Sequence, residues 1–360
     1  MKVFFKSSIL IIVSTLLLFV VAEGISSLSY FIWSYDEKET MAETLHVEYD
    51  PLLGWINKPN VFIEDMYGPE VYLKTNSQRF RNKKDFHVIV PNNENRFICA
   101  GDSFTFGYGV SNDQAWCNLL DDNFSDLQTI NMGQGGYGVD QAFLRYLRDG
   151  NKLNHDLLIF AFISGDFIRM KSSKSWGYPK PLLKLQDGKI IKENVPVPRQ
   201  TFLDKNLPQF KEDLKKLRIV KMYSIFKDSG ETNTFNILAN KAFSNLILKI
   251  FGKLHNSADM SDRTVLFVHL PTQQDYESSF SDELTHFLRK NSQKNGWHYF
   301  NLIKDLRARQ PHSVPELFIR KDLPGYVGSA GHYTEEGNQF IKELIIEKMS
   351  NIRDVAHLLQ

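Results

Sequence analysis

Residues 157–163 form an uninterrupted apolar run, Leu-Leu-Ile-Phe-Ala-Phe-Ile. A strand with one face in water alternates apolar and polar residues, whereas a parallel strand covered by helices on both faces does not. Residues 97–100 are similarly apolar, and 264–270 is mostly so, with Thr264 and His269 as its polar residues. These runs therefore favour an α/β fold in which a central parallel sheet is buried.

Strand and helix patterns alternate around these runs. Strands are predicted at 97–100, 129–132, 157–163, 264–270 and 297–302, and helices at 113–124, 140–149, 281–291 and 334–349. Such alternation predicts a doubly wound parallel sheet flanked by helices on both faces, in the flavodoxin-like three-layer arrangement. We expect this α/β domain to occupy residues 96–350.

Two segments depart from the alternation. Residues 36–95 are rich in turn signals and predict a loop-rich lead-in. Residues 171–262 predict an insertion into the α/β domain, with a hairpin turning at Asp187-Gly188 and a lysine-rich helical region from about Phe210 to His255.

The N-terminus predicts a membrane segment. Residues 7–22 carry no charge, and a helix from 3 to 22 would be about 30 Å long, which matches the hydrocarbon core of a bilayer. Lys2 and Lys6 precede this stretch, which predicts that the N-terminus stays inside and that the rest of the chain is periplasmic or at the cell surface. Residues 1–35 are thus a single-pass transmembrane anchor, or alternatively a signal peptide cleaved after Val20-Val21-Ala22.

Charge and cysteine content exclude several classes of protein. The formal net charge is +1 and no basic block is present, so we expect no nucleic-acid partner. The two cysteines, Cys99 and Cys117, show neither a CxxC spacing nor a cysteine–histidine cluster, which predicts neither a disulfide framework nor a structural zinc site. Cys99 lies in an apolar run and is expected to be a buried thiol.

Three turns follow predicted strands and carry candidate chemistry. They are Gly101-Asp102-Ser103, the glycine-rich segment 133–138, and Ser164-Gly165-Asp166. The carboxyl ends of parallel strands meet at one edge of a sheet, where ligands bind in open α/β folds. A serine nucleophile needs a base and an oxyanion site, and the best candidate base is His332, just before the last predicted helix. The alternative is that Ser103 is only a helix cap and His332 a structural residue.

The same segments resemble the SGNH/GDSL hydrolase superfamily, in particular its membrane-anchored bacterial branch, which is often associated with cell-surface polysaccharides. Residues 101–110 are similar to the nucleophile block of that family, and residues 131–141 to its glycine block. Residues 49–55 and 75–81 resemble the lead-in of the anchored branch. The likeness extends from about Tyr49 to Lys348.

The resemblance implies a nucleophile, a base and two oxyanion donors. These are Ser103, His332, and the backbone N–H groups of Ser103 and Gly136. It implies no metal and no organic cofactor. Two positions depart from the family pattern. Gly165 stands where the family has an oxyanion asparagine, and Ala330 and Ser329 stand where it has an aspartate that orients the histidine. Candidates for compensation are Ser164, Asp166, Ser329 and a backbone carbonyl.

The resemblance therefore implies a membrane-anchored, extracytoplasmic serine esterase or O-acyltransferase. Its substrates would carry ester-linked acyl groups, acetyl in particular, on a surface glycan or another small ester. The two departures favour an alternative, a catalytically degenerate protein of the same fold that binds a glycan or an assembly partner.

Overall fold

A computed structural model describes residues 11–26, 45–175, 178–199, 238, 240–259, 263–320 and 328–359. Its centre is a sheet of five strands in the order β13-β12-β7-β5-β6, and all neighbouring pairs are parallel. The strands are β5 (Asn95–Ala100), β6 (Leu127–Asn131), β7 (Leu157–Phe162), β12 (Thr264–His269) and β13 (His298–Asn301). Of these five strands, the first along the chain, β5, lies between the second, β6, and the third, β7, which is the flavodoxin-like order. The predicted doubly wound sheet is confirmed.

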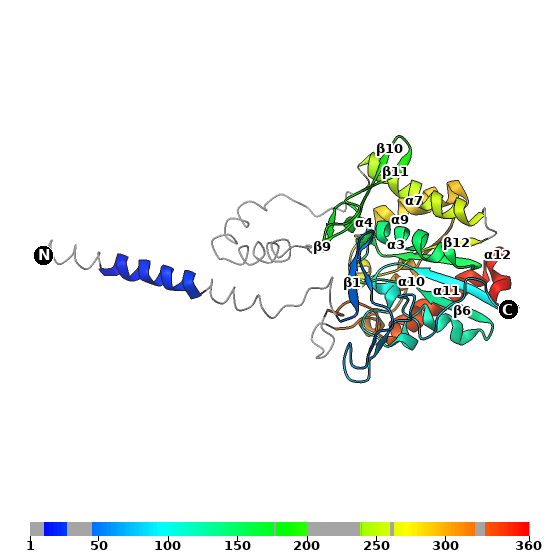
Figure 1. Cartoon of the computed structure of the whole chain (residues 1–360), viewed down its shortest axis with the longest axis horizontal. Coiled ribbons are helices and arrows are strands. Elements are labelled where there is room, and N and C mark those ends of the chain that lie inside the picture. Colours follow the sequence, from blue (N-terminus) through cyan, green and yellow to red (C-terminus); the bar gives the residue numbers. More distant parts are fainter. Residues whose placement is uncertain are drawn as a thin grey trace.

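Helices cover both faces of this sheet (Figure 1). On one face, α3 (Val139–Arg148), α7 (Lys241–Asp259) and α9 (Asp282–Asn295) pack on strand residues such as Ile98 and Phe160. On the other face, α10 (Ile303–Arg307), α11 (Glu335–Ser350) and α12 (Arg353–Ala356) pack on residues such as Cys99 and Ile159. Neighbouring residues of each strand point to opposite faces, so both faces of a buried strand must be apolar.

The segment 171–262 proves to be only partly an insertion. The hairpin is confirmed as β10 (Leu182–Gln186) and β11 (Lys189–Glu193), and Asp187 and Gly188 have φ values of 49° and 71°. Helix α7, in contrast, lies in the main core, where Ile247 and Phe251 are fully buried. It is the crossover helix between β7 and β12. The remainder of the predicted lysine-rich region, up to residue 237, lies outside the described residues.

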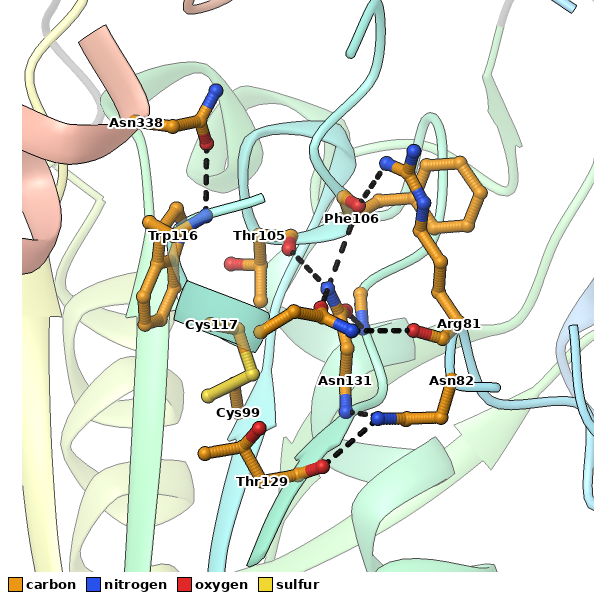
Figure 2. The surroundings of a disulfide bond; sticks show 12 residues. Arg81, Asn82, Cys99, Thr105, Phe106, Trp116, Cys117, Thr129, Asn131 and Asn338 are labelled. Atoms are coloured by element: carbon orange, nitrogen blue, oxygen red, sulfur yellow. Dashed lines mark hydrogen bonds between the residues drawn. A yellow bond between two sulfur atoms is a disulfide. The ribbon is translucent and has the colours of Figure 1, made fainter. Parts of the chain in front are cut away.

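The predicted helix over 113–124 is wrong. Two 3₁₀ helices, η2 (Asn112–Gln114) and η3 (Asn118–Asn123), occupy this segment. The expectation about the cysteines is also wrong, because Cys99 and Cys117 form a disulfide bond between β5 and the start of η3 (Figure 2). Cys99 is buried as expected, but not as a thiol. The disulfide and a hydrogen bond of 3.0 Å from the Trp116 amide to Asn338 Oδ1 hold this segment, and these tertiary contacts override its helical pattern.

The lead-in packs on the sheet domain through short antiparallel pairs. These are β1 (Val47–Asp50) with β2 (Gly54–Asn57), and β3 (Phe62–Ile63) with β4 (Leu73–Lys74). A further pair, β8 (Lys174–Ser175) with β9 (Tyr178–Pro179), precedes the hairpin. Lys180 then forms a fully buried ion pair with Asp140 of α3, which fastens this region to the domain.

Residues 11–26 are helical, and all of their side chains are exposed. Within the described residues, no helix combines the length and the hydropathy needed to cross a membrane. The predicted span starts at residue 3, and residues 1–10 lie outside the described ranges.

Candidate active site

Ser103 is the first residue of a one-turn helix that follows β5. This helix, α2 (Ser103–Phe106), is capped by Asp102, whose Oδ1 accepts a hydrogen bond of 2.9 Å from the amide of Phe104. The interpretation of Ser103 as a helix cap is therefore wrong, since its neighbour has that role. Gly107 ends the helix at φ 80°, in the left-handed region that glycine adopts most easily. The hydroxyl of Ser103 is thus left for other contacts.

His332 approaches Ser103 from the turn before α11. Its Nε2 lies 2.8 Å from Ser103 Oγ, and its Nδ1 lies 3.0 Å from the carbonyl oxygen of Ser329. A carbonyl oxygen can only accept, so Nδ1 carries the proton and donates it to Ser329. Nε2 then has a free lone pair and accepts from the serine hydroxyl. This is the tautomer that a general base next to a serine nucleophile requires.

The surroundings of His332 favour its neutral form. Burial lowers the pKa of the imidazole, while the carboxylate of Asp102 and the hydrogen bond to Ser329 act in the opposite direction. Aromatic rings enclose it, with the centroids of Phe104 and Tyr108 at 4.7 and 5.3 Å. The ring is therefore held in place and is available as a base at neutral pH.

The glycine block forms the second wall of the site. A Cβ at Gly133 would lie 2.1 Å from the amide nitrogen of Phe106, so only glycine allows the chain to pass so close to α2. Asn131, at the end of β6, donates from Nδ2 to the carbonyl of Thr105 at 3.0 Å, which joins the two turns (Figure 2). Within the described part of the chain, the amides of Ser103 and Gly136 have no hydrogen-bond partner. Two N–H groups thus remain for an oxyanion.

The third turn is the first turn of helix α4 (Ser164–Arg169). Gly165 supplies no side chain at the position of the family asparagine. Ser164 Oγ bonds to Nε2 of the fully buried His269 at 2.9 Å and to the hydroxyl of Ser281. The hydroxyl of Ser164 is therefore committed to this buried network. Among the candidates for compensation, the backbone carbonyl of Ser329 is the group that contacts His332.

An ion cluster that the sequence analysis missed lies beside Ser103. Arg169 Nη1 is 3.3 Å from Asp102 Oδ2, and it also bonds to Asp166 and, at 2.9 Å, to the carbonyl of Tyr137. Asp102 Oδ2 is in turn 3.4 Å from Ser103 Oγ. Burial, and then the nearby Asp102 carboxylate, raise the pKa of Asp166 well above its usual value. The only sequence signal for Arg169 is its spacing of three residues from Asp166, which places both on one face of a helix.

Residues of the lead-in hold these turns in position. The guanidinium of the fully buried Arg81 donates to the carbonyls of Phe106, Gly107 and Val110, at the end of α2 and in the loop after it. Trp55 Nε1 donates to the carbonyl of Gly135 at 2.8 Å. The segments that contain Trp55 and Arg81 were recognisable in the sequence, but no pattern there predicted a role for either residue.

The described residues contain no group of three or more histidine, cysteine, aspartate or glutamate side chains arranged to hold a metal ion. The catalytic roles expected for Ser103, His332 and Gly136 stay predictions, but the structure does bring these groups to one edge of the sheet.

Much of this chain is similar to a known protein family and to solved structures. Residues 97–345, from β5 to α11, match the family described as GDSL-like lipase/acylhydrolase. No curated protein matches the sequence. Among solved structures, a member of the lipolytic G-D-S-L family from Veillonella parvula is 14% identical and has a TM-score of 0.40, over 71% of this chain and 99% of its own. A lipase/acylhydrolase from Enterococcus faecalis is 12% identical, with a TM-score of 0.41 over 71% and 96%. The acetyl xylan esterase AlAXEase is 17% identical, with a TM-score of 0.39 over 70% and 98%.

The family match covers more than half of the chain and contains both Ser103 and His332. The resemblance to the superfamily is thereby confirmed, whereas the membrane-anchored branch stays a prediction. The chain belongs to the GDSL-like lipase/acylhydrolase family.

Proposed function

We propose that the chain is an extracytoplasmic, membrane-anchored serine esterase or O-acyltransferase that acts on acyl esters, in particular acetyl esters of a cell-surface glycan. The observation that carries this proposal is the distance of 2.8 Å between Ser103 Oγ and His332 Nε2, with Nδ1 held by Ser329. Family membership supports ester hydrolysis in general.

The proposed reaction starts with attack of Ser103 Oγ on the ester carbonyl. His332 Nε2 takes the hydroxyl proton as the Oγ–C bond forms, and the amides of Ser103 and Gly136 stabilise the oxyanion. His332 then protonates the leaving alkoxide as its bond to carbon breaks, which leaves an acyl-Ser103. Water in hydrolysis, or an acceptor hydroxyl in transfer, then gives its proton to His332 Nε2 and attacks the acyl carbon. The bond from that carbon to Oγ breaks, His332 returns the proton to Ser103 Oγ, and the acid or the new ester leaves.

The imidazolium that forms in this reaction has no carboxylate on Nδ1, unlike the family pattern. The Ser329 carbonyl accepts the Nδ1 proton in its place, and Asp102 supplies a nearby negative charge that raises the pKa of His332. Arg169 balances that charge through its contact with Asp102. These two features support an active site that has been rearranged, since the orientation and the charge are both provided by other groups.

The disulfide between Cys99 and Cys117 supports the extracytoplasmic location, because disulfides persist mainly in oxidising compartments. The exposed apolar side chains of residues 11–26 support the anchor, since a large exposed apolar surface is typical of a segment that contacts lipid or another protein. A reporter enzyme that works only outside the cytoplasm should be active when it is fused after Gln360. Activity of a reporter that works only in the cytoplasm, fused at the same place, would contradict this topology.

The catalytic proposal is tested by labelling the full chain with a fluorophosphonate and by measuring hydrolysis of p-nitrophenyl acetate. We expect both in the wild type and neither in Ser103→Ala. The missing side chain at Gly165 favours the alternative, a degenerate protein of the same fold that binds a glycan or an assembly partner. A folded wild-type protein that neither labels nor hydrolyses would favour this alternative.

A further inference from the structure

A concave surface lies between the β10–β11 hairpin, α7 and α9. It is a groove of about 1040 Å³, which we call the lysine groove. It is lined by Gly188, Lys189, Ile190, Leu248, Lys249, Gly252, Lys253, His255, Asn256, Ser257, Asn291, Lys294, Asn295 and Trp297. Trp297 directly precedes β13, whereas Ser103 follows the end of β5, and the strands are parallel. The lysine groove and Ser103 are therefore at opposite edges of the sheet.

The described residues of the lysine groove carry charge of one sign. Among those that line it, four are lysines and none is an aspartate or a glutamate. All four are exposed, and none forms an ion pair with a described residue. Lys249 and Lys253 are four residues apart on one face of α7, where like charges repel each other. A ligand with negative charge on this face would relieve the repulsion between these lysines.

The remaining lining groups suit a sugar. Trp297 packs its ring 5.8 Å from that of Phe267, and a Cβ at Gly252 would lie 3.5 Å from Trp297 Cζ2. The absence of a side chain at Gly252 thus leaves the edge of the indole accessible. Asn291 and Asn295 donate from Nδ2 to carbonyls of their own helix at 2.8 and 2.7 Å, which leaves Oδ1 of each as an acceptor for hydroxyl groups. A flat membrane surface fits a concave groove less well than a flexible polymer does.

From this combination we infer that the lysine groove binds a strand of an acidic polysaccharide, with its carboxylate or sulfate groups on the lysines and a sugar ring against Trp297. This binding site is separate from the reaction proposed for Ser103 and does not depend on it. It would hold a polymeric ligand on the protein without taking part in chemistry.

The test is isothermal titration calorimetry of the full chain with oligogalacturonate and with a heparin oligosaccharide, each at low and high salt. We expect at least one of them to bind, more weakly at high salt because screening weakens contacts between exposed charges. Lys249→Glu/Lys253→Glu should raise the Kd at least tenfold. Gly252→Ala should also weaken binding, because its methyl group covers Trp297, although alanine favours the helix. Ser103→Ala should bind as the wild type does.

The matched control is Lys84→Glu/Lys304→Glu, which makes the same change of net charge at two exposed lysines outside the lysine groove. It should leave the Kd within twofold of the wild type. Equal losses in the groove variant and in this control would overturn the inference. So would the absence of binding to both acidic probes, equally tight binding of a neutral maltooligosaccharide, or stronger binding to phosphatidylglycerol vesicles than to either glycan.

Discussion

Placing an asparagine at position 165 tests whether the site lacks an oxyanion donor. A Cβ at Gly165 would meet only the side chain of Ile163, at 3.5 Å, which is an ordinary contact. Its φ is not positive, so a side chain brings no backbone strain. Gly165 lies in the first turn of α4, one residue before Asp166. Asp166 pairs with Arg169, which also contacts Asp102, the residue before Ser103. The new amide is therefore expected to fit and to lie beside the nucleophile.

The expected gain in kcat/KM follows from the contribution of a single oxyanion donor to catalysis. Removal of such a donor lowers kcat by ~10²–10³, or about 2.7–4 kcal/mol. A donor placed in a site that has not been refined around it should recover less than this full effect. We expect Gly165→Asn to raise kcat/KM for p-nitrophenyl acetate by roughly tenfold to a hundredfold, or about 1.4–2.7 kcal/mol of transition-state stabilisation.

Two matched variants isolate the amide. Gly165→Ala adds a side chain without a donor and should leave activity nearly unchanged. Gly165→Asp has the size of asparagine but adds negative charge beside the oxyanion, so it should lower activity. Adding Ala330→Asp should contribute less than Gly165→Asn does, because His332 Nδ1 already has an acceptor in Ser329. A folded Gly165→Asn protein that labels with a fluorophosphonate but shows no gain would refute this account of the oxyanion site.

Three further predictions concern the base, the disulfide and the ion cluster. Burial lowers the pKa of His332, and only the neutral ring is a base. The value of kcat/KM should therefore rise with pH through an apparent pKa below about 6.5 and then level off. A midpoint at or above that value would contradict the assignment of His332 as the base. The Cys99–Cys117 bond closes a loop with a sequence separation of 18, so Cys99→Ala/Cys117→Ala should lower the free energy of unfolding in urea by about 3 kcal/mol. A decrease in this free energy well below ~1 kcal/mol would show that the bond does not constrain the unfolded chain. Arg169→Met should lower kcat/KM at least tenfold, because methionine leaves the Asp102 carboxylate beside Ser103 without the Arg169 cation. Arg169→Lys should recover part of this loss. Unchanged kinetics would exclude a role for Arg169 in balancing the charge of Asp102.

The candidate site was predictable from the sequence only in outline. The turns of Ser103, Gly136 and His332 follow or precede strands and helices with strong patterns, and parallel strands bring such turns to one edge. The substitutes for the missing family residues were not predictable in this way. A backbone carbonyl such as that of Ser329 has no sequence signature, and the approach of Arg169 to Asp102 depends on how α4 lies against α2.

The amino-acid sequence by itself determined the parallel sheet and the positions of its strands. Continuous apolar runs such as 157–163 are stable only where helices cover both faces, and this requirement is local and leaves few alternatives. The tertiary structure alone decided the Cys99–Cys117 bond, the 3₁₀ helices around it and the place of α7 in the main core. These features depend on contacts between residues distant in the sequence, and local patterns carry no information about which distant partner a residue meets.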